Sequence, residues 1–139
     1  MGCDIHVHIE VRHEGAWLHY TTPRVDRNYR LFSLMAGIRS EDTGVQPIFP
    51  VRGLPTDCSL ITSWEYEHDA LRFTPKSASV IVDNELPELQ RAYCEVANTS
   101  LVDLATDLEW TVFHTFVQGS SMAHHPEYDG LRIIFWFDD

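Results

Sequence analysis

The first twelve residues alternate between apolar and polar side chains with a strict two-residue period. Every odd position from Cys3 to Val11 is apolar, and every even position from Asp4 to Arg12 is polar or charged. This period predicts a β-strand with one buried face. Alternate side chains of a strand point to the same face, so the polar ones form a row with neighbours roughly 6.5–7 Å apart. The row consists of Asp4, His6, His8 and Glu10, and two imidazoles between two carboxylates make it a candidate site.

The end of the chain carries a second strand pattern, over residues 131–138. One face holds Leu131, Ile133, Phe135 and Phe137, and the other holds Arg132, Ile134, Trp136 and Asp138. A strand that is apolar on nearly both faces is usually central in its sheet. If this strand pairs with the first one, its second face adds Arg132, Trp136 and Asp138 to the polar row.

Between these two strands the sequence carries signals for one further strand, several helices and one long loop. Residues 13–16 carry a hairpin signal with Gly, and residues 17–22 are rich in strand formers, so a second strand is expected to run antiparallel to the first. Helices are expected from a cap at Asp26 or Asn28 to Ile38, over 59–71, over 75–82, from residue 85 onward and over 101–117. Residues 39–58 hold three prolines and no sustained period, which predicts a long irregular loop.

This order of elements predicts an α+β protein. We expect one antiparallel sheet that includes the N- and C-terminal strands, with the helices packed mainly on one face. The 139 residues are enough to bury a core and have the length of one domain, so we expect a single domain over residues 1–139.

The charged side chains limit the class of partner. The chain has 21 acidic against 10 basic residues, a formal charge of -11, which repels long nucleic acids and anionic membranes. All the basic residues except Lys76 are Arg. Arg can bind a phosphate through two parallel hydrogen bonds, so a small anionic ligand held by local Arg is compatible with the net charge.

Cysteine spacing and hydropathy indicate the compartment. Cys3, Cys58 and Cys94 are odd in number and lack Cys-x-x-Cys spacing, which argues against a disulfide framework or a thiolate zinc site. No apolar run approaches the roughly 18 residues that span a bilayer, and the N-terminus lacks a signal-peptide pattern. We therefore expect a cytoplasmic protein without a membrane partner, and we leave a homo-oligomer open.

Four short stretches form a recognisable set. They are Met-Gly-Cys-Asp-Ile-His at 1–6, Arg-Asn-Tyr with Leu-Phe and Ala-Gly within 27–37, Arg-Gly-Leu-Pro at 52–55, and Ile-Phe-Trp-Phe-Asp at 134–138. Together they resemble a family of small uncharacterised proteins encoded by bacteriophages and prophages. The resemblance implies a phage origin, and hence the host cytoplasm, and it puts most weight on Asp4 and His6.

The polar row admits four interpretations, of which the first is a solvated strand face without chemistry. The second is a metal site. Asp-x-His-x-His on an early strand is similar to the first strand of amidohydrolase-type metal hydrolases, and Asp4, His6 and His8 could share one divalent ion. Those enzymes also need His and Asp at further strand ends that this chain lacks. The expected cofactor is therefore either none or one divalent metal ion.

The third interpretation is metal-free cleavage of a phosphodiester. A neutral His takes a proton from the attacking hydroxyl, a second His protonates the leaving oxygen, and an Asp fixes one tautomer. The catalytic candidates are Asp4, His6, His8 and His68, with His124 and His125 as further candidates for the second acid. The ligand-binding candidates are Arg52 and Arg132 for the phosphate, Tyr29 and Trp136 for stacking on a base, and Asp138. For Arg52, a structural turn is the competing expectation.

The fourth interpretation is a protein that binds a small anionic nucleotide in the same pocket and does not cleave it. Small acidic phage proteins often act against host defence, and several bacterial defences signal with small cyclic or adenosine-diphosphate-ribose nucleotides. The candidate site and the resemblance to phage proteins together lead us to expect a protein that cleaves a small anionic nucleotide of this kind, or else sequesters it.

Overall fold

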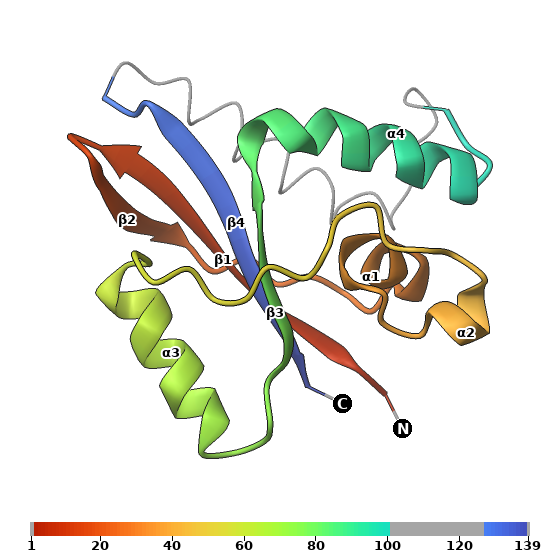
Figure 1. Ribbon diagram of the computed structural model, residues 1–139, viewed down its shortest axis with the longest axis horizontal. Helices are drawn as coiled ribbons and strands as arrows, with labels where there is room; N and C mark the ends of the chain where they lie inside the picture. The colour runs from red at the N-terminus through yellow and green to blue at the C-terminus, as the bar shows by residue number, and fades with distance from the viewer. Residues whose placement is uncertain (1, 101–126, 139) are drawn as a thin grey trace.

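A computed structural model describes residues 2–100 and 127–138 of the chain. Its elements are β1 (Asp4–His13), β2 (Ala16–Thr21), α1 (Tyr29–Ala36), α2 (Ser40–Thr43), α3 (Leu60–Ala70), β3 (Lys76–Val82), the 3-10 helix η1 (Asp83–Glu85), α4 (Leu86–Val96) and β4 (Gly130–Asp138) (Figure 1). The helix predicted over 101–117, and both His124 and His125, lie outside the described residues. Within those residues, no helix is long and apolar enough to cross a membrane.

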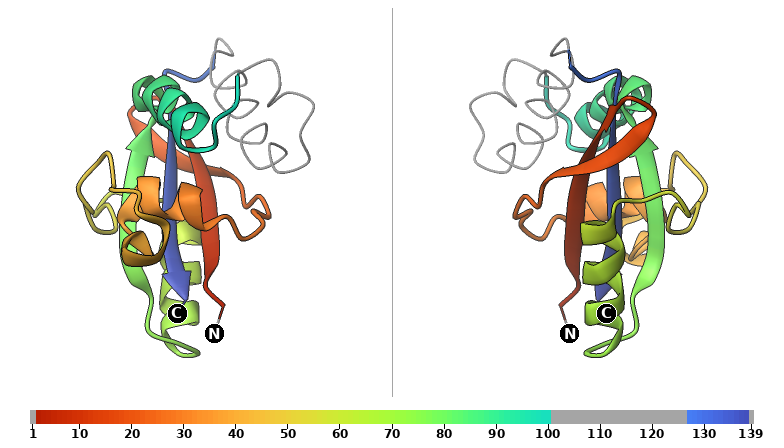
Figure 2. Two further views of the ribbon diagram at one scale, coloured as in Figure 1. Left: turned by 90° about the vertical axis from the view of Figure 1, so that its right-hand side faces the viewer. Right: turned by 90° about the vertical axis from the view of Figure 1, so that its left-hand side faces the viewer.

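The four strands form one antiparallel sheet in the order β2-β1-β4-β3. This confirms the predicted α+β class and the pairing of the first strand with the last. In the β1–β4 register, Asp4 lies opposite Asp138, and His6 lies opposite Trp136. The two ends of the described chain therefore meet at the same end of the sheet (Figure 2).

One face of the sheet packs against α1 and α4 to form the hydrophobic core. The odd-numbered apolar residues of β1 and β4 are buried there together with Phe32 of α1 and Leu89 of α4. Helix α1 begins where predicted, because the Asn28 side chain accepts a hydrogen bond from the Leu31 backbone N–H at 3.1 Å. It ends at Gly37, whose φ of 73° is a left-handed conformation that favours glycine.

Helix α3 lies on the opposite face of the sheet (Figure 1). Its range agrees with the predicted helix, and Ser59 caps it by accepting a hydrogen bond from the Thr62 N–H at 3.2 Å. Its polar side, and not its apolar side, faces the sheet. The helix buries Thr62 and Asp69, while Leu60 is 88% and Trp64 is 60% exposed. The helices thus lie mainly on the core face, and α3 covers the face that carries the polar row.

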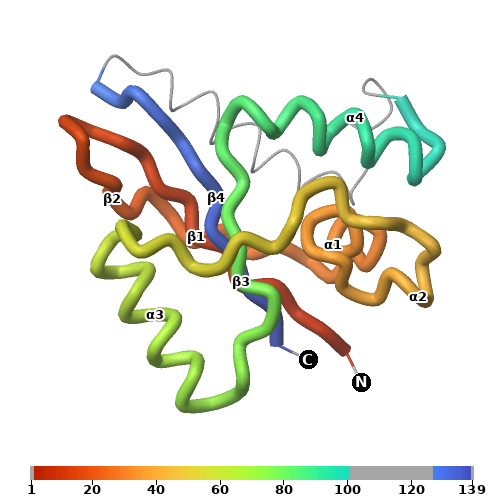
Figure 3. The backbone as a smooth tube through the Cα atoms, in the orientation of Figure 1, coloured from red at the N-terminus to blue at the C-terminus, as the bar shows by residue number. Residues whose placement is uncertain are grey.

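Residues 75–82, which were predicted to form a helix, form strand β3 instead. The prediction followed the Thr74-Pro75 cap signal, but Val80, Ile81 and Val82 are β-branched and pair with the central strand β4. The segment between α2 and α3 crosses β3 (Figure 3). There the Gly53 N–H donates to the Ala78 carbonyl at 2.8 Å. Sheet pairing therefore outweighs the local helix signal.

Candidate functional site

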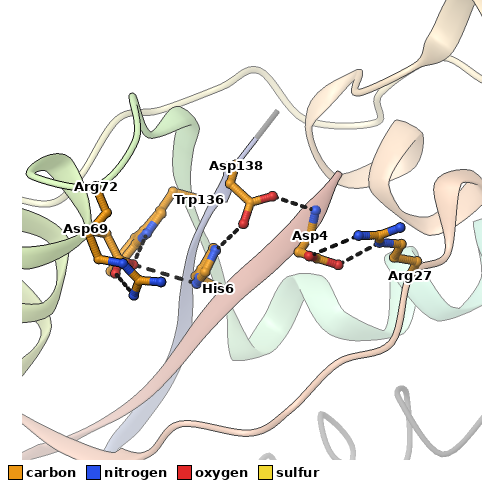
Figure 4. A network of polar contacts seen from close by, with 7 residues as sticks. All are labelled: Asp4, His6, Arg27, Asp69, Arg72, Trp136 and Asp138. Carbon is orange, nitrogen blue, oxygen red and sulfur yellow. Dashed lines mark hydrogen bonds and ion pairs between the residues drawn. The ribbon is translucent and has the colours of Figure 1, made fainter. Parts of the chain in front are cut away.

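The imidazole of His6 lies between two carboxylates that come from two other elements (Figure 4). Its Nε2 lies 2.9 Å from Oδ2 of Asp138 on β4, and its Nδ1 lies 3.6 Å from Oδ2 of Asp69 on α3. The His6 side chain is 29% exposed, so solvent and small molecules can reach the ring. The arrangement brings together residues that are more than 130 positions apart in the sequence.

Both carboxylates have fixed positions. Oδ1 of Asp138 accepts the Asp4 backbone N–H at 2.8 Å, and Oδ2 of Asp69 accepts the Trp136 indole N–H at 3.0 Å. An ionised carboxylate only accepts hydrogen bonds, so the proton of the neutral His6 ring is on Nε2 and the lone pair is on Nδ1. No hydrogen bond to Nδ1 is found among the described residues. The site therefore presents a fixed tautomer whose Nδ1 can take up a proton next to Asp69.

His6 lines a cleft of about 440 Å³ between the sheet, the segment after β2, and helix α3. Its polar walls include His8, Thr22, Arg24, Glu65, Asp69 and Arg72. A second hollow of about 570 Å³ shares Arg24 with this cleft and extends toward Asp4 and Arg27. The cleft thus combines one accessible imidazole, several carboxylates and two guanidinium groups.

Asp4 does not orient His6 through its side chain. Its carboxylate accepts hydrogen bonds from Nε and Nη2 of Arg27 at 2.7 and 3.2 Å. These bonds hold the pKa of Asp4 below its usual range. The contribution of Asp4 to the His6 site is its backbone N–H, which positions Asp138.

His8 and His68 do not supply a second acid in the cleft. His8 is 3% exposed and stacks on Trp136, with the ring centroids 4.8 Å apart. Burial, followed by the neighbouring His19, lowers the pKa of His8 to about 4, so the ring is neutral at pH 7. His68 is exposed and stacks on Trp64, which lies on the outer side of α3.

Arg132 is part of the protein interior. Its guanidinium donates two hydrogen bonds to Oε1 of the fully buried Glu10, at 3.0 and 2.8 Å, and one to Asp57 at 3.0 Å. It also lies 4.0 Å from the centroid of the Trp17 ring. All these contacts stabilise the fold and argue against the predicted phosphate-binding role.

The other predicted ligand contacts also have partners within the protein. Arg52 binds the Glu85 carboxylate through two contacts of 2.6 Å. This agrees with the alternative expectation that Arg52 has a structural role. Trp136 is fully buried, so its faces are not available to a base. The Tyr29 ring lies under the Arg39 guanidinium at 4.9 Å. Of the predicted ligand-binding residues, Asp138 is the one whose side chain makes a polar contact with the His6 ring.

Two of the interpretations of the polar row receive no support from this geometry. A solvated face is excluded, because Glu10 is fully buried and His8 nearly so. For the metal interpretation, no group of three or more His, Cys, Asp or Glu side chains within residues 2–100 and 127–138 is arranged to hold an ion. The Asp4 side chain points toward Arg27, which it binds through both carboxylate oxygens (Figure 4).

The sequence analysis missed the residues that α3 brings to the site. Asp69 lay within the helix predicted over 59–71 and Arg72 followed it, and neither was named as a site residue. A usable signal was present: Thr62, Glu65, Asp69 and Arg72 recur at helical spacing and form a polar stripe. Arg24 was missed because a single Arg in a connecting segment has no distinguishing pattern.

Comparisons with protein-family models, curated proteins and solved structures find no match for this chain. The resemblance to phage proteins therefore stays a prediction.

Proposed function

We propose that the protein cleaves a phosphodiester bond of a small nucleotide, with His6 as the general base. One observation carries the proposal: the His6 ring is fixed by Asp138 on Nε2, and its Nδ1 lies 3.6 Å from the buried Asp69 in an open cleft. A base held in one tautomer by one carboxylate, beside a second that stabilises the imidazolium, is an arrangement suited to proton transfer.

The substrate class follows from the charges and size of the cleft. Arg24 and Arg72 line it and can bind a phosphate, whereas the net charge of -11 repels a polymeric nucleic acid. A volume of about 440 Å³ is in the range of small-ligand pockets. Signalling nucleotides of bacterial immunity in the host cytoplasm would fit these limits and the resemblance to phage proteins.

The proposed reaction uses His6 twice. Nδ1 takes the proton of the attacking hydroxyl or water as its oxygen bonds to phosphorus. The bond from phosphorus to the leaving oxygen breaks, and the His6 imidazolium returns the proton to that oxygen. Arg24 and Arg72 neutralise charge that develops on the phosphoryl oxygens.

Sequestration without cleavage is the second candidate function. It is favoured by the position of His8 and His68, neither of which is placed to act as a separate acid. The acidic residues Glu65, Asp69 and Asp138 weigh against it, because they oppose the tight binding of an anion that sequestration requires.

A panel assay separates these functions. The protein is incubated with cyclic dinucleotides and adenosine-diphosphate-ribose derivatives, with and without a chelator, and the mixture is analysed by chromatography. New product peaks support cleavage. Loss of free ligand that returns intact on heating supports sequestration, and an unchanged panel contradicts both. Activity that disappears with the chelator contradicts the metal-free reaction.

A further inference from the structure

Three polar atoms meet where β1, β2 and the segment after β2 come together. Nδ1 of His8 lies 3.3 Å from Nε2 of His19 and 3.3 Å from Oγ1 of Thr22, and Nε2 of His19 lies 3.0 Å from the same hydroxyl. The β1–β2 pairing has a register shift next to this point, between Ile9, which pairs with Thr21, and Glu10, which pairs with His19. The three atoms form a nearly regular triangle.

Hydrogen bonds cannot satisfy all three sides of this triangle. A ring nitrogen carries either a proton or a lone pair and never both, and the Thr22 hydroxyl has one proton to donate. If both nitrogens carry lone pairs, one contact is a hydrogen bond. If either nitrogen carries a proton, at most two of the three contacts are hydrogen bonds. A cation that accepts lone pairs can bind all three atoms at once.

The dimensions of the triangle match one face of a coordination tetrahedron. With bonds of about 2.0–2.1 Å, two ligand atoms of tetrahedral Zn²⁺ lie about 3.3–3.4 Å apart. The observed sides are 3.3, 3.3 and 3.0 Å. We propose that His8, His19 and Thr22 form a site for a divalent transition-metal ion, with the two imidazoles as its ligands and the hydroxyl as a third ligand or a partner of metal-bound water.

The surroundings of the triangle support this site. Trp136 stacks on His8 with an interplanar angle of 19°, which fixes the ring before an ion arrives. Both His8 and Thr22 line the cleft that contains His6, so an ion can enter, and Glu65 in the same wall supplies a negative charge. Imidazole nitrogens suit Zn²⁺, Cu²⁺ and Ni²⁺ rather than Mg²⁺ or Ca²⁺.

The test is titration of the full chain, freed of metal by chelator, with Zn²⁺ in a calorimeter and with Cu²⁺ followed by electron paramagnetic resonance. The wild type should bind one ion with hyperfine splitting from two nitrogens. His8→Phe and His19→Gln should each raise the Kd by about 100-fold or more. Replacing a residue that only supports a metal ligand weakens binding less, by about 10- to 100-fold. The controls, His68→Gln and the double variant His124→Gln/His125→Gln, should bind as the wild type does.

Several results would overturn the site. They are a wild type that binds neither ion, a His19→Gln variant with unchanged affinity, and loss of binding in either control. His8 is buried, so His8→Phe is checked for folding by circular dichroism. If it does not fold, His19→Gln decides, because His19 is half-buried on the edge strand β2 and its loss leaves the core in place.

Discussion

Glu10 stands in the row of polar side chains, yet it is fully buried. Its Oε2 accepts hydrogen bonds from the Ser59 N–H and the Thr62 hydroxyl, both at 2.8 Å, and its Oε1 binds Arg132. Burial by itself would raise the pKa of Glu10, but these hydrogen bonds outweigh it and hold the pKa below the usual range. Two-residue alternation predicted which face Glu10 lies on. It could not predict that a helix covers that face.

Removal of Arg132 should destabilise the protein strongly. Arg132→Met leaves the buried Glu10 charge without its partner, and such a change costs about 3–5 kcal/mol of unfolding free energy. The exposed pair of Arg12 and Asp129, with an N–O distance of 3.0 Å, is the control, and Arg12→Met should cost at most about 1 kcal/mol. Urea unfolding measures both values. Equal losses in the two variants would contradict the structural role of Arg132.

The buried His8 should make stability fall in acid. The pKa of about 4 in the folded protein is below the ordinary histidine pKa of 6.5, so the unfolded chain binds the proton first as the pH falls. Stability should therefore decrease from about pH 6.5 to pH 4, by roughly 3 kcal/mol in total from this group. Urea unfolding across this range, in buffer with chelator, tests the prediction. His8→Phe should show a flatter dependence, and an equal slope would rule out the proposed cause.

Helix α3 shows why an element can be predicted correctly while its packing is not. Its range followed from the spacing of its apolar residues, but the polar side packs on the sheet and the apolar side is exposed. Glu10 holds this orientation by accepting hydrogen bonds from the first turn of the helix. A local period gives two faces and leaves open which of them meets the sheet, because that choice depends on a residue about 50 positions away.

A substitution at the contact between α3 and Glu10 tests this orientation. Thr62→Val keeps the side-chain shape but removes the donor to Glu10, so the unfolding free energy should fall by about 1–3 kcal/mol. Thr56→Val, at an exposed position before the helix, should change it by less than about 0.5 kcal/mol. Thermal melting of the two variants compares them. A Thr62→Val protein as stable as Thr56→Val would show that the contact contributes little.

The whole sheet depends on its last strand. β4 lies between β1 and β3, and its apolar residues on both faces, including Ile134 and Phe135, are fully buried. This placement was predictable, because an apolar pattern on both faces of a strand is typical of the interior of a sheet. That β3 is a strand was not predictable, because it forms by pairing with a segment about 55 residues later in the chain.

Deletion of residues 136–139 should therefore disrupt the fold. The truncated protein loses two fully buried aromatic side chains, Trp136 and Phe137, and the strand partner of Asp4 and His6. We expect an insoluble protein, or one that lacks a cooperative thermal transition. Circular dichroism and thermal melting give the result, and a truncated protein that melts as the wild type does would contradict the central role of β4.

The candidate site was predictable in part. Alternation brought His6 and Asp138 to one face once the two terminal strands were paired, and the structure places them 2.9 Å apart. Asp69 belongs to a polar stripe that the sequence shows, but its approach to His6 also requires this stripe to pack on the sheet, which the helical period does not determine. The roles of Arg132 and Trp136 also could not be read from the sequence, since burial decides whether a polar or aromatic side chain meets a ligand or the protein.

The most direct measurement of the role of His6 compares turnover of a small phosphodiester by the wild type, His6→Gln and His68→Gln. We expect His6→Gln to lower kcat by about 100- to 10,000-fold, the contribution of a general base, while ligand affinity measured by calorimetry changes little. His68→Gln, which alters an exposed histidine outside the cleft, should turn over as the wild type does. A His6→Gln protein that folds and keeps the full kcat would contradict the proposed role of His6.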